Sequence, residues 1–278
     1  MKPEHRFVVV NDVRLRYLEW KGPKSATMVL LHGIGDNSHI WDHFSRSING
    51  AVRIIAIDQR GHGESDWAVP PAYRFDDYVA DLAGVVKILM LEHIVLMGHS
   101  MGALHATRFA AHYPDRVAGL IHADIEPCPP AWNKNYLTGL YNNLPVSYPT
   151  VDAYVDQMQN DSPYADRELL RRFASHALRQ GDNGTFTCLC DREVFAHFDP
   201  RYDLRHCLRQ INCPTLVVRG EESAVMPREA AENMCREIPK GRLTEVPRAK
   251  HPMHTDNPSA FEEAVRTFLE EIGFIGER

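Results

Sequence analysis

The sequence predicts an α/β fold in which helices cover both faces of a mostly parallel sheet. Short apolar segments alternate with amphipathic helical segments toward both ends of the 278-residue chain. The apolar segments are continuous rather than alternating, which is typical of strands that helices cover on both faces. The alternation stops once, in the middle of the chain, and later resumes. These three observations predict one α/β domain that carries an insertion.

The first part of the chain contains most of the expected strands. Two strands, 6–10 and 14–20, flank Asn11-Asp12, a pair typical of a hairpin turn. Further strands are expected at 27–33, 52–58, 93–98 and 117–124, and helical segments at 39–48, 74–91 and 101–113. Pro114 ends the last of these helices because proline lacks the N–H that a helix interior requires.

Residues 126–210 interrupt this order. Helical patterns cover 151–159 and 167–180, and the polar turn at 181–184 ends the second one. We expect no strand in this segment. It therefore predicts a helical cap inserted into the domain.

The alternation resumes after Pro214 and returns the chain to the same sheet. Strands are expected at 215–218 and 242–246, and helices at 227–238 and 258–272. We therefore expect a core formed by 1–125 and 211–278, with 126–210 as its cap.

Composition narrows the classes of function. A net charge of −6 and a pI near 6.2 disfavour a nucleic-acid partner, which usually requires a basic face. The N-terminus lacks the apolar core of a signal peptide, and no apolar run approaches the length of a membrane span. We expect a cytoplasmic protein without a membrane partner. Six cysteines without a C-x-x-C pair predict reduced thiols.

No metal or cofactor is expected. Cys188, Cys190 and His197 lie close in sequence, but their spacing does not match a zinc pattern.

The segment Gly98-His99-Ser100-Met101-Gly102 predicts a serine nucleophile. It follows a buried strand and opens a helix, which is the context of a nucleophile elbow. The sharp turn favours glycine at the flanking positions and projects the serine oxygen above the sheet. The first N–H groups of the following helix then face a developing oxyanion.

Two further glycine turns follow earlier strands. The turn at 32–37 lacks dinucleotide-loop spacing, and we expect the backbone N–H groups of Ile34 and Met101 to form an oxyanion hole. The turn at 58–66 is interpreted as structural, including its His62.

Among fifteen histidines, the base is expected in the loop after the last strand. His251 is the first choice there and His254 the weaker candidate. His32 and His99 adjoin glycine turns and are interpreted as structural hydrogen-bonding residues. An H-x-x-H metal pair is disfavoured because Pro252 interrupts any helix between the two histidines.

Five segments together resemble the α/β-hydrolase superfamily. They are HGIGDNSHIW, DQRGHGESD, GHSMG, PTLVVRGEES and VPRAKHPMHTDNP, in the order and spacing of that superfamily. The resemblance implies an eight-stranded sheet with a variable cap. It also implies Ser100 as nucleophile, His251 as base, and Ile34 and Met101 as oxyanion donors. A serine at position 100 disfavours the branches that use an aspartate nucleophile.

The sequence departs from the superfamily pattern at the position of the catalytic acid, the carboxylate that orients the base. Most members place aspartate three residues after the glycine that ends the seventh strand, and Ser223 stands there. Asp124, at the end of the sixth strand, is the preferred acid, as in hydrolases similar to the acetamidomethylene-succinate type. A strand end is also rigid, which suits a residue that must orient an imidazole. Glu222 remains the alternative acid.

The cap is expected to shape the substrate pocket. Trp132, Tyr136 and Tyr141 could line an apolar pocket, or they could belong to the core of the cap itself. Pro252 follows His251, so no carboxylate-binding residue stands there, and we expect a carboxylesterase that acts on small to medium esters. The alternatives are a hydrolase of C–C bonds, amides or lactones and, less favoured, a non-catalytic receptor. The expected partner is a small ester, and the sequence leaves open whether two copies of the chain form a homodimer.

Overall fold

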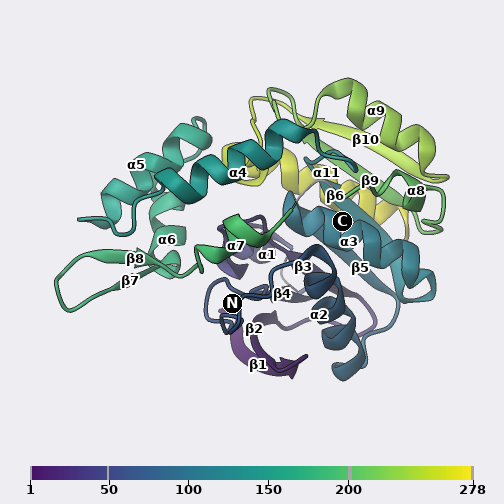
Figure 1. Cartoon of the computed structure of the whole chain (residues 1–278). Coiled ribbons are helices and arrows are strands. Elements are labelled where there is room, and N and C mark those ends of the chain that lie inside the picture. Colours follow the sequence, from purple (N-terminus) through teal and green to yellow (C-terminus); the bar gives the residue numbers. More distant parts are fainter. Residues whose placement is uncertain (1, 49, 200–201, 277–278) are drawn as a thin grey trace.

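Eight strands of the chain form one sheet (Figure 1). They are β1 (Glu4–Val10), β2 (Val13–Trp20), β3 (Thr27–Leu31), β4 (Arg53–Ile57), β5 (Ile94–His99), β6 (Val117–Ala123), β9 (Thr215–Gly220) and β10 (Gly241–Val246). Their order is β1-β2-β4-β3-β5-β6-β9-β10. Among the described residues of this sheet, β1–β2 and β2–β4 pair antiparallel and the other neighbours pair parallel. The computed structural model describes residues 2–48, 50–199 and 202–276, and its sheet confirms the predicted fold class.

Helices pack on both faces of this sheet. One face is covered by η1 (Ser38–Trp41), α1 (Asp42–Ser47) and α11 (Pro258–Glu271), and the other by α2 (Phe75–Ile88), α3 (Met101–His112) and α9 (Arg228–Glu237). The residues of β3 divide between the faces as the pleat requires. Met28 and Leu30 pack in the core beneath α11, while Val29 and Leu31 pack in the core beneath α2 and α3.

A long insertion separates β6 from β9. It contains α4 (Ala131–Asn143), α5 (Val151–Asp161), α6 (Arg167–Ala177), β7 (Leu178–Gln180), β8 (Phe186–Cys188), α7 (Glu193–His197) and α8 (Arg205–Leu208). Figure 1 shows α5, α6 and the β7–β8 hairpin projecting to one side of the sheet. Tyr154, Val155, Leu170 and Phe173 form a separate small core there. Among the described helices, none is long and apolar enough to cross a bilayer.

The expectation of an insertion without strands is wrong. The helix expected to reach residue 180 ends at Ala177, and Leu178–Gln180 pairs antiparallel with Phe186–Cys188. Gly184 takes the left-handed conformation, with φ of 79°, that the connecting turn requires. The sequence carried this signal, because an Asn-Gly pair followed by Thr-Phe-Thr is typical of a hairpin.

Candidate active site

Ser100 lies in a strained turn between β5 and α3. Its φ of 52° falls in the left-handed region, which costs a non-glycine residue about 1–3 kcal/mol. A Cβ at Gly98 would lie 2.2 Å from the carbonyl oxygen of Gly102, and a Cβ at Gly102 would lie 2.6 Å from that of Leu31. The Ser100 N–H donates to the Ala123 carbonyl at 2.9 Å. Close backbone packing therefore fixes the serine at the carboxyl edge of the sheet.

Asp124 directly follows β6 and is fully buried. Its Oδ2 lies 2.7 Å from Nδ1 of His251, and its Oδ1 accepts the Gly220 N–H at 3.0 Å. Because β6 pairs with both β5 and β9, its end lies between the serine turn and the loops of the neighbouring strands. The structure thus brings the preferred acid and the preferred base into contact.

Ser223 supports this carboxylate. Its hydroxyl donates to Asp124 Oδ2 at 2.5 Å and accepts the Val225 N–H at 3.1 Å. The residue that replaces the usual aspartate therefore hydrogen-bonds the aspartate of the neighbouring strand. Sequence reasoning missed this contact, although the position of Ser223 three residues after Gly220 could have indicated it.

Glu222, the alternative acid, has a different partner. Its side chain is exposed, and its carboxylate accepts the Tyr164 hydroxyl at 2.8 Å. Among the described residues, the carboxylate that contacts His251 is that of Asp124.

The expected oxyanion donors line the same cavity as the serine. Ile34 and Met101 both face the cavity that Ser100 lines. Within the described part of the chain, neither backbone N–H has a hydrogen-bond acceptor. The next residue, Gly35, donates its N–H to Nε2 of His62 at 3.1 Å. The loop is thus held by its neighbours while these two N–H groups stay available.

Two buried histidines, both in the neutral form, hold the loop that carries Ile34. Nδ1–H of His62 donates to the Arg60 carbonyl at 2.9 Å, and Nδ1–H of His32 donates to the Gly33 carbonyl at 2.7 Å. Nε2 of His32 accepts the Gln59 N–H at 3.0 Å. Burial lowers the pKa of His32 to about 3 and the pKa of His62 to about 4. Both histidines therefore act structurally, as the sequence indicated.

The cavity above Ser100 measures about 850 Å³ and is lined by both the sheet edge and the cap. Its wall includes His251 together with Trp132 and Tyr136 of α4. A volume of this size suits a small organic molecule.

Tyr141 does not fit the pocket expectation. It is absent from the described residues that line the cavity. Its hydroxyl donates to Glu193 at 3.2 Å, and the Arg192 guanidinium lies 5.7 Å from the centre of its ring. Tyr141 therefore joins α4 to α7 within the cap. Sequence spacing could not reveal which side of α4 faces the cavity.

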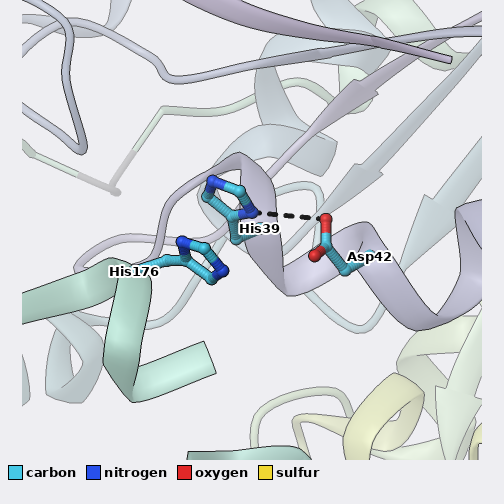
Figure 2. A group of neighbouring side chains, drawn as sticks. All are labelled: His39, Asp42 and His176. Atoms are coloured by element: carbon cyan, nitrogen blue, oxygen red, sulfur yellow. Dashed lines mark ion pairs between the residues drawn. The ribbon is translucent and has the colours of Figure 1, made fainter. Parts of the chain in front are cut away.

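One group of side chains has ligand atoms close enough for a metal ion. His39, Asp42 and His176 bring these atoms within 4.8 Å of one another (Figure 2). The two rings stack 3.7 Å apart and nearly parallel, at 8°. Imidazole binds a metal through a lone pair in the ring plane, so stacked rings do not converge on one ion. Arg16 donates to Nε2 of His39 at 3.2 Å, which leaves the proton on Nδ1, facing Asp42. This group fits histidine packing better than a metal site.

The comparison with known proteins agrees with this architecture. Residues 26–258 match the family described as alpha/beta hydrolase fold. The chain belongs to this family. The predicted superfamily is therefore confirmed.

Two curated relatives and one solved structure are similar along most of the chain. The 2-(acetamidomethylene)succinate hydrolase of Mesorhizobium japonicum is 28% identical over 245 residues, 87% of each chain. The crystal structure of E-2-(acetamidomethylene)succinate hydrolase has a TM-score of 0.88 at 27% identity, covering 96% of this chain and 99% of the other. Esterase Rv0045c of Mycobacterium tuberculosis is 28% identical, covering 91% of this chain and 85% of its own.

Proposed function

We propose that this protein is a serine hydrolase that cleaves small to medium carboxylic esters. The observation that supports this most is the contact of His251 Nδ1 with the buried Asp124, 2.7 Å away, in the cavity that Ser100 lines. A carboxylate at Nδ1 fixes the tautomer whose Nε2 lone pair accepts a proton. His251 can then act as the base for Ser100.

The reaction proceeds through an acyl-enzyme. Ser100 Oγ attacks the ester carbonyl while Nε2 of His251 takes the serine proton. The N–H groups of Ile34 and Met101 stabilise the oxyanion of the tetrahedral intermediate. The intermediate collapses, and His251 gives the proton to the departing alcohol. Water, deprotonated by the same imidazole, then hydrolyses the acyl-enzyme and restores Ser100.

Two acids in the cavity and the residue after the base favour an ester over a diacid. One relative is named for a succinate, which carries two carboxylates. In this chain, Asp36 and Asp161 line the cavity, and Pro252 rather than a cation follows the base. A second carboxylate placed beside Asp36 or Asp161 would meet like charge, although Lys250 and Arg192 also line the cavity. A relative that is named an esterase supports the ester alternative.

The proposal is tested with p-nitrophenyl esters of increasing acyl length. We expect hydrolysis of short and medium esters, and a loss of at least about 10⁴-fold in kcat in Ser100→Ala. A fluorophosphonate probe should label Ser100 in the wild type, as peptide mass spectrometry would show. The control is Ser175→Ala, which alters an exposed serine whose hydroxyl donates to the Arg172 carbonyl of its own helix.

The same experiment separates the alternatives. Labelling of Ser100 without ester cleavage would redirect the proposal to C–C bonds, amides or lactones, because the same residues serve those reactions. Failure to label Ser100 would support a non-catalytic receptor.

A further inference from the structure

Two carboxylates of the cavity have no bonded partner. Asp36, in the oxyanion loop, and Asp161, at the end of α5, both line the cavity. Within the described residues, neither carboxylate has a hydrogen bond or an ion pair. The other acids of the same wall are bonded, since Asp191 accepts the Tyr73 hydroxyl at 2.5 Å and Glu222 accepts that of Tyr164. Asp36 is half-buried and Asp161 is exposed, so Asp36 is the carboxylate that the fold partly shields from water without giving it a partner among the described residues.

A buried histidine beside Asp36 offers a second free acceptor. His99 lines the cavity with only 3% of its surface exposed, and its Nε2–H donates to the His251 carbonyl at 3.0 Å. This bond places the proton on Nε2, so Nδ1 carries a lone pair, and Nδ1 has no partner among the described residues. A buried acceptor without a donor is rare in folded proteins, and a water molecule or a ligand atom is needed to complete it.

The two acceptors face the same space. A Cβ at Gly33 would lie 3.0 Å from Nδ1 of His99 and 3.1 Å from Oδ2 of Asp36. Nδ1 of His99 and Oδ2 of Asp36 therefore both border the small gap that Gly33 leaves by carrying no side chain. The gap adjoins the reaction centre, because Gly33 precedes Ile34 and His99 precedes Ser100.

The histidines nearest this gap supply no positive charge. Burial lowers the pKa of His99 far below its usual value and the pKa of His254 to about 3. His254 also lines the cavity, and neither of its ring nitrogens has a partner in the described chain. Burial raises the pKa of Asp36 to about 7, with His251 opposing this rise and Asp161 adding to it. Lys250 and Arg192 also line the cavity, and the Arg192 guanidinium already donates to the Leu144 carbonyl. At their own position, the Asp36 carboxylate and Nδ1 of His99 favour a ligand that brings hydrogen-bond donors and a positive charge.

We propose that Asp36 and Nδ1 of His99 form a subsite for a protonated amine, with Asp161 adding negative charge at longer range. An ammonium group has three donors and no acceptor, and it forms charge-assisted bonds with a carboxylate. A substrate carboxylate would meet a like charge and a lone pair. This inference rests on the proposed ester hydrolysis and narrows its substrates to small esters that carry an ammonium group near the scissile carbonyl.

The test compares esters of equal shape and different charge. On the acyl side these are methyl 4-aminobutanoate, methyl pentanoate and monomethyl glutarate; on the alcohol side, 3-aminopropyl acetate and butyl acetate. We expect kcat/KM of the wild type to favour the ammonium ester over its neutral isostere by about tenfold or more on one side. Monomethyl glutarate should be the poorest substrate. The side that shows the preference identifies the part of the substrate that carries the amine.

Variants then assign the preference to its residue. In Asp36→Asn the ratio of ammonium to neutral ester should fall toward one, whatever the absolute rates. Glu222→Gln removes a charge from the same cavity wall and should keep the wild-type ratio, because Glu222 already bonds Tyr164. A ratio near one in the wild type overturns the inference but leaves ester hydrolysis intact.

A binding measurement keeps the inference testable if none of these esters is cleaved, which would contradict the proposed function instead. n-Butylammonium should raise the Tm of the wild type more than n-butanol does, and less so in Asp36→Asn. Equal effects of both additives on the wild type overturn the ammonium subsite. This comparison does not require the variant to fold.

Discussion

At the scale of single residues, the Asp124 carboxylate is held by three groups from different parts of the chain. The Gly220 N–H, the Ser223 hydroxyl and the His251 imidazole all lie within 3.0 Å of its oxygens. A fully buried carboxylate needs such partners, because removal from water penalises an unpaired charge heavily. The same bonds fix the direction from which the carboxylate meets His251.

Asp124→Asn therefore tests the proposed acid. The amide keeps the shape of the side chain, but it can stabilise the wrong tautomer of His251. We expect kcat for a p-nitrophenyl ester to fall by about 10⁴, as for other triads. Glu222→Gln, the matched carboxylate-to-amide control, should retain nearly full activity. The opposite result, a collapse in Glu222→Gln alone, would assign the acid to Glu222.

The sequence supplied two candidates for the acid that contacts His251, but it could not decide between them. Asp124 and Glu222 both precede His251 in the chain, and both follow a strand. The choice depends on where β6 and β9 place these side chains, which is a distance between segments almost a hundred residues apart. The proximity of Asp36 to His99 beside Gly33 could not be predicted for the same reason.

At the scale of elements, the turn between β5 and α3 depends on close backbone contact. The space at Gly98 is occupied by the backbone of Gly102 and Ala103, both within 2.5 Å of an added Cβ. Backbone atoms move only if the helix moves, so this contact sets how closely α3 approaches the sheet.

Gly98→Ala should therefore destabilise the fold. We expect a loss of about 1–3 kcal/mol or more in the free energy of unfolding, measured by urea denaturation, together with lower esterase activity. The control is Gly139→Ala in α4, where an added Cβ meets nothing within 4 Å. That variant should be neutral or stabilised by up to about 1 kcal/mol. Equal stability of both variants would contradict the packing argument.

The elements of the core were predicted better than those of the cap. Core strands such as β3 are continuous apolar runs, and their pattern follows directly from burial on both faces. The β7–β8 hairpin has only three residues in each strand and is largely exposed, so its apolar pattern is weak. Its turn residues were the stronger signal.

At the scale of the whole molecule, several histidines are buried in the neutral form. Burial is the largest cause that lowers the pKa of six of them: His32, His62, His99, His105, His122 and His254. In the unfolded chain each would bind a proton near pH 6.5. As pH falls below that value, these histidines bind protons in the unfolded state but not in the folded state, so the free energy of unfolding decreases.

We therefore expect stability to fall as the solution is acidified from about pH 7 to pH 4, by up to roughly 1.4 kcal/mol per pH unit for each such histidine. Asp36 has the opposite sign, because its raised pKa makes the folded state bind a proton first. Burial also raises the pKa values of Asp81, Glu126, Asp161 and Asp256, and the six histidines outnumber these five acids. Urea denaturation over this range measures the slope. His105→Gln should make it shallower, and a flat profile in the wild type would contradict the prediction.

The sequence by itself determined the sheet and the strand–turn–helix around Ser100, and it predicted His251 as the base that we propose. These follow from local patterns: continuous apolar runs, glycines beside a serine, and a histidine after the last strand. The tertiary structure decided which acid meets His251, which cap aromatics face the cavity, and which acceptors stay without partners. Such properties depend on the packing of segments distant in sequence, where a side chain shifted by a few ångströms gains or loses its hydrogen bond.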